Sequence, residues 1–307
     1  MTDDALVRSL RADLARAGLT GSFLATDLRT GAEVGFDADA RYPLASLVKV
    51  PLAAAVLEAM ARGEVDGARP VLLDPSLGTP GPTGTCLFRH PAQVAVEDLL
   101  VLALTVSDDT AADALFTLVP PAEVTRLLRS LGITSITARH PILELHRTLA
   151  AVLPPGDRHL ALSLAISAGT DGGGHLIPQL DEGAANVGTA RGLTRLLAEI
   201  WTGDRLASGT RERLRALLGA NVLRHRLAPE LATDRSRWSS KTGTFLHLRH
   251  EAGVVEHADG TTIAVVALTS SCVPAAEQPL AEQAIGAVAR RLHDAVRADD
   301  DGWHAGA

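Results

Sequence analysis

Apolar residues follow a helical period at the start of the chain and then change to strand character. Leu6, Leu10 and Leu14 stand at i, i+4 and i+8, which predicts an amphipathic helix. The runs GSFLATDL and AEVGFDA come next and flank the turn RTG, a pattern typical of a β-hairpin. Pro43 is expected to end the strand character, and a helix is expected to begin near Ser46.

From there to about residue 222 the pattern is helical, interrupted by loops rich in proline and glycine. The loops DPSLGTPGPTG and AGTDGGGHLIPQLDEG have no repeat and no low-complexity bias. We therefore expect a helical block, with helices over residues 46–61, 96–104, 110–118, 122–131, 158–167, 189–201 and 210–218.

Strand character returns in RWSSKTGTFLHL, EAGVVEH and TTIAVVALTS, and a last amphipathic helix is predicted over residues 276–296. Because strands lie at both ends of the sequence, we expect one antiparallel five-stranded sheet flanked by the terminal helices, with the helical block inserted as a second lobe. The predicted fold class is α/β (α+β) and two-lobed, with a cleft between the lobes. In residue terms, the sheet lobe is 1–44 with 225–298, the all-helical lobe is 45–224, and 299–307 is a tail.

Composition restricts the partners that the chain can have. With 46% hydrophobic residues, a chain of 307 residues can bury a large core, and a net charge of −7 disfavours nucleic acid or an anionic membrane as partner. A small-molecule substrate is expected instead, while the oligomeric state stays open. The first residues form no apolar leader, so the expectation is a cytoplasmic protein, and Cys86 and Cys272 are expected to be reduced thiols.

Lysine is rare in this sequence and marks the candidate chemistry. The 29 Lys and Arg residues include only two lysines, Lys49 and Lys241. Ser46 and Lys49 form an S-x-x-K at the start of a predicted helix, a spacing that puts both side chains on one face. Lysine can accept the proton of a serine hydroxyl, whereas arginine cannot be deprotonated in a protein. Taken alone, the pair could equally be a helix-capping serine and a surface charge.

The second lysine decides between these interpretations. Lys241 lies in SSKTGT, and Ser107, Asp108 and Asp109 lie between the two lysines in LTVSDDTAADALF. S-x-x-K, S-D-N and K-T-G occur together in class A β-lactamases and penicillin-binding proteins. The chain resembles this family over nearly its whole length, including YPLASLVKVPLAAAVL and the closing strands RHEAGVVEHADGTTIAVVALTS.

The resemblance implies a role for each residue at a matching position. Ser46 would be the acylated nucleophile and Lys49 its proton partner. Ser107 would relay a proton to the leaving group. Lys241 would hold a substrate carboxylate and bias Ser107.

The resemblance also implies the residues that bind the substrate. Thr242 and Gly243 would line the strand beside it. The backbone N–H groups of Ser46 and Thr244 would form the oxyanion hole. Arg249 is a further candidate for the substrate carboxylate, and a solvated strand arginine is the alternative.

The middle motif departs from the family pattern, because Asp109 stands where the family has asparagine. An ionised aspartate only accepts hydrogen bonds, so Asp109 favours a substrate group that donates. It is also expected to pair with Lys49 and to favour the ammonium form of that lysine, which makes Lys49 a poorer base.

The deacylating glutamate of the family has no clear counterpart here. Glu144 is the carboxylate available in ITARHPILELHRTL, but the Leu-Asn pair that follows in the family is missing. Glu144 is therefore either the base that activates water or a residue on a helix face. Residues 149–183 form an extra segment that is expected to overhang the cleft.

No metal or cofactor is predicted. The histidines between His90 and His257 form no H-E-x-x-H arrangement, and no cysteine pair stands beside a histidine pair at ligand spacing. His146 is grouped with the other surface and loop histidines.

The residues together indicate a serine acyl-transfer enzyme acting on a small lactam, amide or ester that carries a carboxylate. By resemblance, weak β-lactam hydrolysis is the first expected activity. A cytoplasmic esterase or transacylase of small-molecule biosynthesis is one alternative, and a penicillin-binding sensor without turnover is another.

Overall fold

A computed structural model describes residues 3–153, 156–168 and 174–304, and a five-stranded antiparallel sheet forms its centre. The strand order is β2-β1-β9-β8-β7, so the hairpin near the N-terminus pairs with the three late strands through β1 and β9. This confirms the predicted sheet. Its strands are β1 (Leu19–Asp27), β2 (Glu33–Phe36), β7 (Ser236–Phe245), β8 (Leu248–His257) and β9 (Thr262–Ser271).

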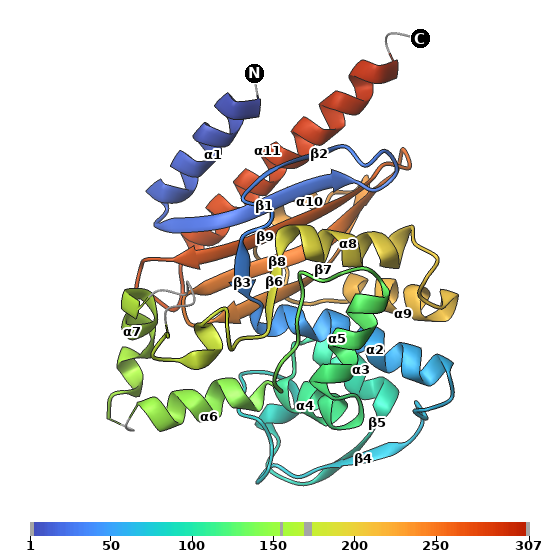
Figure 1. The fold of residues 1–307 in the computed structure, drawn as a ribbon, viewed down its shortest axis with the longest axis vertical. Helices are drawn as coiled ribbons and strands as arrows, with labels where there is room; N and C mark the ends of the chain where they lie inside the picture. The colour runs from blue at the N-terminus through green and yellow to red at the C-terminus, as the bar shows by residue number, and fades with distance from the viewer. Residues whose placement is uncertain (1–2, 154–155, 169–173, 305–307) are drawn as a thin grey trace.

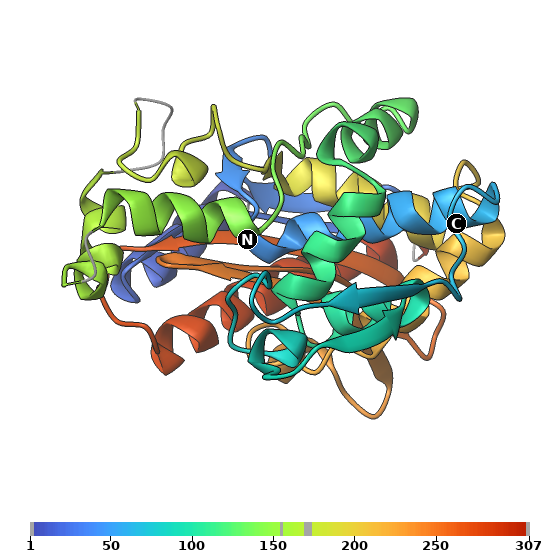
Figure 2. The same ribbon diagram turned by 90° about the horizontal axis from the view of Figure 1, so that it is seen from below.

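The terminal helices cover one face of the sheet. α1 (Asp3–Arg16) and α11 (Pro279–His304) lie side by side against β1 (Figure 1). The expected leucine stripe of α1 is buried there with the apolar face of α11, and α11 continues past the predicted end of the last helix. Viewed from below, α11 lies on one side of the sheet and α6 (Leu143–Val152) on the other (Figure 2).

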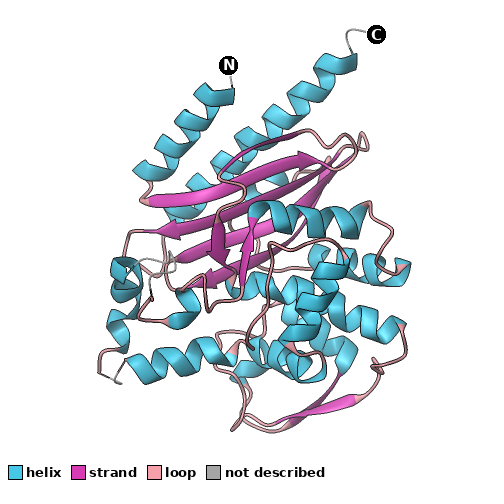
Figure 3. Cartoon of the chain, viewed as in Figure 1, coloured by secondary structure: helices cyan, strands magenta, loops and turns pink. Residues whose placement is uncertain are grey.

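The helical block packs against the opposite face of the sheet. α8 (Ala190–Trp201) contacts β9, β1 and β8 directly, and α2 (Lys49–Ala61) runs through the middle of the block with nearly every residue buried. Figure 3 shows the five-stranded sheet in one half of the molecule and most helices of the block in the other. The other helices of the block are α3 (Val96–Thr105), α4 (Asp109–Leu118), α5 (Pro121–Ser130), α9 (Ser208–Gly219) and the short α10 (Ala228–Leu231).

Two small antiparallel sheets were not expected from the sequence. β3 (Arg41–Pro43) pairs with β6 (Val187–Thr189), and β4 (Pro70–Leu73) pairs with β5 (Ala92–Ala95). Pro43 therefore does not precede the helix directly but ends a short strand, a position where its missing N–H is tolerated. β3 ties the start of the Ser46 segment to residues far along the chain.

The extra segment adds a layer beside the cleft rather than a separate domain. It carries the last turn of α6, a 3-10 turn over Arg158–Leu160, and α7 (Ala161–Ala168), close to the predicted helix at 158–167. Ala165, Ile177 and Leu180 pack on Leu248 of β8, which anchors the segment to the sheet. The GTDGGGH loop falls mostly outside the described residues.

Two further expectations concern cysteine and membranes. Cys86 and Cys272 are both free thiols. Over the ranges that the structure describes, no helix combines the length and apolar character needed to cross a bilayer.

Candidate active site

Ser46 lies on a tight turn between β3 and α2. Ala45, the residue before it, has φ +47°, a left-handed conformation that costs a non-glycine residue about 1–2 kcal/mol. The chain then makes a 3-10 turn over Ala45–Val48 and continues into α2, where Pro51 is accommodated in the first turn. This path leaves Ser46 partly exposed while Ala45, Leu47 and Val48 are buried.

Lys49 is fully buried one turn after Ser46, and its ammonium points toward the middle motif. Its Nζ donates to the Ser107 carbonyl oxygen at 2.7 Å, lies 3.2 Å from Ser107 Oγ, and donates to Asp109 Oδ1 at 2.6 Å. The expected ion pair between Lys49 and Asp109 is present. No hydrogen bond to Ser46 Oγ occurs among those of the described residues.

Ser107 stands between the two lysines of the chain. It lies in the short link between α3 and α4 and has φ +58°, a second strained position beside the cleft. Lys241 Nζ lies 2.9 Å from Ser107 Oγ, on the side away from Lys49. The hydroxyl therefore contacts two lysine amino groups from separate parts of the sequence.

Lys241 is fully buried on β7. Its Nζ also donates to the Thr242 carbonyl oxygen at 2.9 Å. Burial lowers the pKa of Lys241 well below its ordinary value, and the positive charge of Lys49 lowers it further while Asp109 opposes the effect. An anionic group bound nearby would stabilise the ammonium form of Lys241.

Asp108, the middle residue of the motif, supports the site without facing the cleft. Its Oδ1 accepts from the Ala111 N–H and caps α4, and its Oδ2 accepts from the N–H and hydroxyl of Thr85. Gly84 is needed beside it, because a β-carbon there would lie 2.3 Å from Asp108 Oδ2. Asp108 thus fixes the loop that brings Pro82 to the cleft.

Asp109 begins α4 and turns its second carboxylate oxygen toward α6. Oδ2 lies 3.7 Å from His146 Nε2, while Oδ1 holds Lys49. Burial opposes ionisation of Asp109, but the charge of Lys49 and the contact with His146 outweigh it, so the pKa of Asp109 lies below its ordinary value. Asp109 is therefore ionised at neutral pH.

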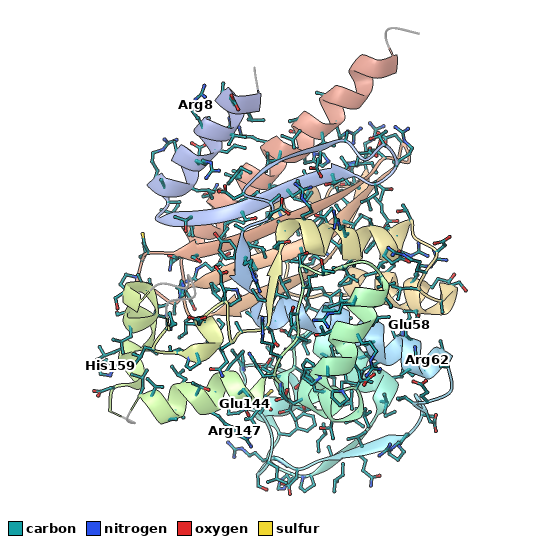
Figure 4. All side chains as sticks on the ribbon, viewed as in Figure 1. Arg8, Glu58, Arg62, Glu144, Arg147 and His159 are labelled. Carbon is teal, nitrogen blue, oxygen red and sulfur yellow. The ribbon has the colours of Figure 1, made fainter. Side chains whose placement is uncertain are left out.

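Glu144 lies on the same helix as His146 but has a different environment. Its side chain is 37% exposed, and Oε1 accepts a hydrogen bond from Arg147 Nη1 at 3.1 Å. Figure 4 labels both Glu144 and Arg147 on α6. Glu144 is absent from the lining of the cleft, which fits the helix-face alternative better than the water-activating one.

A cleft of about 680 Å³ opens beside Ser46, Ser107 and Asp109. Most of the substrate-side residues expected from the sequence line it, and Gly243 does not. Alternation along β7 explains the difference: Thr242 and Thr244 face the cleft, while Gly243 faces the Ser46 turn, where a β-carbon would lie 2.8 Å from the Leu44 carbonyl oxygen. The expected residues that line the cleft are Ser46, Ser107, Asp109, Thr242, Thr244 and Arg249.

Two arginines stand at the far end of the cleft. Arg249 is buried, and its guanidinium donates to the carbonyl oxygens of Leu246, Ala275 and Ala276. Arg226 is also buried and donates to Thr244 Oγ1 at 2.8 Å. Arg226 is therefore closer than Arg249 to the edge of β7 along which a substrate would lie.

Arg226 and His146 are the residues that the sequence did not single out. Arg226 is one of many arginines, and only its burial beside Thr244 distinguishes it. The sequence places His146 among the surface and loop histidines. It follows Glu144, the candidate water-activating base, by two residues on α6. Within the described parts of the chain, no three His, Cys, Asp or Glu side chains form a metal-binding group.

The arrangement can perform acyl transfer at a serine. Ser46 opens to the cleft at the N-terminal end of a buried helix, a lysine and a second serine stand behind it, and a second lysine offers positive charge to a ligand. A hydroxyl bridged by two lysine amino groups can pass protons in either direction.

Known proteins resemble the chain over its whole length. A family model described as the beta-lactamase enzyme family matches residues 5–296. Beta-lactamase regulatory protein BlaB of Streptomyces cacaoi is 53% identical over 309 residues, covering 97% of this chain and 99% of its own. A β-lactamase structure from Sphaerobacter thermophilus superposes with a TM-score of 0.76 at 21% identity, covering 96% of this chain and 98% of its own. A mutant of PBP-A, in an acyl-enzyme complex with penicillin-G, superposes with a TM-score of 0.75 at 20% identity, covering 96% of this chain and 97% of its own.

Proposed function

The chain belongs to the β-lactamase enzyme family, and from this premise we propose that it forms a covalent acyl-enzyme at Ser46 with a small lactam, and releases the acyl group slowly. It is a serine hydrolase of the class A β-lactamase type, and the proposal concerns its nucleophile, substrate and turnover. The observation that carries the proposal is Ser107 Oγ between Lys49 and Lys241, at 3.2 and 2.9 Å, beside a serine that opens to the same cleft.

Acylation requires a path for the proton of Ser46. Lys49 is the proton acceptor in this proposal, and its Nζ is bonded to the carboxylate of Asp109 at 2.6 Å and must turn from it toward Ser46 Oγ. The lactam C–N bond breaks as the Ser46 ester forms, and Ser107 then delivers a proton to the leaving nitrogen. The tight Lys49–Asp109 pair supports a slow first step.

Substrate binding uses the other side of the cleft. The backbone N–H groups of Ser46 and Thr244 would stabilise the oxyanion, and both residues line the cleft. A substrate carboxylate would lie against Thr242 and Thr244, which line the cleft, within the field of the buried Lys241 that precedes them on β7, and Arg226 donates to Thr244. Arg249 would add positive charge at the end of the cleft. Its guanidinium already donates to the carbonyl oxygens of Ala275 and Ala276, so it would not form a bidentate contact with the ligand.

A sensor is the second candidate function, because the relative from Streptomyces cacaoi is named a regulatory protein. The solvent-facing position of Glu144 also favours it, since an acyl-enzyme without a carboxylate beside it persists. In that case the acylated form itself would be the signal, and hydrolysis would only reset it.

Intact-protein mass spectrometry with benzylpenicillin tests the proposal. We expect an adduct of the mass of the whole penicillin on the parent protein and none on Ser46→Ala. Cys272→Ser, which removes an exposed nucleophile away from Ser46, should leave the adduct unchanged. Loss of the adduct over minutes to hours would support a slow hydrolase, and its persistence would support the sensor.

The outcome that contradicts the proposal is equally direct. If the parent protein gives no adduct and no turnover with lactams, activated esters or amides, or if Ser46→Ala is modified as readily as the parent, Ser46 is not the nucleophile.

A further inference from the structure

α6 is clamped to the face of α4 that carries the charged end of the site. Asp109 and Asp113 are four residues apart on α4 and so lie on the same face. The Asp113 carboxylate accepts the N–H groups of Ile142 and Leu143 at 2.6 and 2.7 Å, which fixes the first turn of α6. With that end fixed, His146, one turn further, meets Asp109.

His146 has the environment of an oriented base rather than of a surface histidine. Its side chain is 30% exposed, so water can reach it, and Nε2 faces Asp109 Oδ2 at 3.7 Å. This separation is longer than a hydrogen bond, and such contacts in ligand-free enzymes often shorten when substrate binds. A carboxylate that faces Nε2 holds the proton there and leaves Nδ1 as the acceptor.

Among the described residues of α6, the neighbouring charged side chains make no polar contact with Asp109. Glu144 faces solvent and is bonded to Arg147. Like Glu144, His146 is absent from the lining of the cleft, but within the described part of α6 it is the titratable side chain that contacts Asp109, and Asp109 lines the cleft together with Ser46.

From this geometry we propose that His146, oriented by Asp109, is the catalytic base that deacylates Ser46. The inference rests on the proposed function and extends it to the release step. A water molecule gives a proton to His146 Nδ1, and its oxygen forms a bond to the acyl carbon. The ester C–Oγ bond breaks and Ser46 Oγ takes a proton from the Lys49 ammonium. His146 then releases its Nδ1 proton to solvent, and Lys49 regains a proton from solvent through the cleft. The product leaves as a carboxylic acid that ionises in solvent.

The pH dependence of release follows from this role. The charged groups around the ring are Asp109 and Asp113 on α4, Lys49 behind Asp109, and the Glu144–Arg147 pair on α6 itself. Because only a neutral imidazole accepts a proton, the deacylation rate should rise with pH.

The test is the lifetime of the benzylpenicillin adduct, followed by intact-protein mass spectrometry from pH 5 to 8. We expect His146→Gln to lengthen the lifetime by at least about tenfold, because positioned general bases contribute about 10²–10⁴-fold. Its acylation rate should stay within a few-fold of the parent, its pH profile should become flat, and added imidazole should shorten the lifetime again.

His159→Gln is the matched control, because His159 is exposed and labelled well away from α6's Glu144 in Figure 4. An equal adduct lifetime in His146→Gln and His159→Gln would overturn the inference, and so would a longer lifetime in Glu144→Gln instead. A flat pH profile in the parent protein would also overturn it. Absence of any Ser46 adduct would overturn the proposed function, and this inference with it.

Discussion

Asp109 determines how the two protons of the site are held. One of its oxygens binds the Lys49 ammonium at 2.6 Å and the other faces His146. A neutral amide at this position cannot stabilise a cation to the same extent, whereas the carboxylate does so in a site where its own side chain is only 13% exposed. In the proposed mechanism, the same residue slows the first proton transfer and supports the last one.

Asp109→Asn should separate these two effects. We expect faster acylation by benzylpenicillin, by about tenfold if the ion pair is worth roughly 1.4 kcal/mol, because Lys49 Nζ is no longer held at a carboxylate and can turn to Ser46 Oγ. Deacylation should slow, because the amide no longer fixes the His146 tautomer. Rapid-mixing mass spectrometry measures both rates in one experiment.

Glu64→Gln serves as control for that variant, because Glu64 is an exposed carboxylate paired with Arg62. Slower acylation in Asp109→Asn would show that the carboxylate is needed to hold Lys49 in place rather than to restrain it.

The sequence identified most of the residues of the site but not their contacts. Ser46 and Lys49 are recognisable because their spacing is local, and Lys241 because it is followed by Thr242 and Gly243 in a K-T-G motif. The contact between His146 and Asp109 could not be predicted, because it depends on the direction that α6 takes across α4, which the carboxylate of Asp113 sets. A single histidine in a sequence carries no sign of that geometry.

At the scale of elements, the position of Ser46 depends on the contact between β7 and the turn before α2. Gly243 lets the strand approach closely, since a β-carbon would lie 2.8 Å from the Leu44 carbonyl oxygen and 3.0 Å from Leu47 Cγ. Backbone atoms on both sides leave no flexible group to move away.

Gly243→Ala should therefore displace the Ser46 turn. We expect a loss of about 1–3 kcal/mol in the free energy of unfolding and a large drop in adduct formation at Ser46. Thermal unfolding and penicillin labelling measure these effects. Gly209→Ala is the control, because a β-carbon on this residue of α9 has open space; unchanged labelling in Gly243→Ala would contradict the role of the contact.

Long elements were predictable and short ones were not. α2, α8 and the three late strands have enough residues for periodicity to show. β3 and β6 have three residues each and exist because they pair with each other across the fold, so nothing in RYP or VGT indicates a strand.

At the scale of the whole molecule, His250 ties the sheet to the segment that leads into the Ser46 turn. It is fully buried on β8, its Nε2 bonds to the Pro43 carbonyl oxygen at 2.9 Å, and its Nδ1 accepts from the Thr269 N–H at 3.0 Å. Burial lowers the pKa of His250 to about 3, and burial likewise lowers the pKa of His247 to about 4.

These histidines should make the fold sensitive to acid. Below about pH 6.5 the unfolded chain takes up protons on both residues while the folded chain does not, so stability falls as the pH falls from there toward 3 to 4. Each group contributes a slope of up to about 1.4 kcal/mol per pH unit. Urea unfolding of the parent and of His250→Gln at pH 7, 6 and 5 measures the difference; the variant should lose less stability on acidification. The exposed His90→Gln should behave as the parent, and equal slopes in all three proteins would contradict the prediction.

The complete burial of both lysines has a practical consequence for chemical labelling. An amine-reactive reagent finds no side-chain target on the folded protein, apart from the terminal amino group, because Lys49 and Lys241 are each 0% exposed. Any acylated lysine recovered in a peptide digest therefore records a molecule whose cleft had opened to the reagent. The extent of lysine acylation therefore measures how often the region around Lys49 and Lys241 opens to solvent.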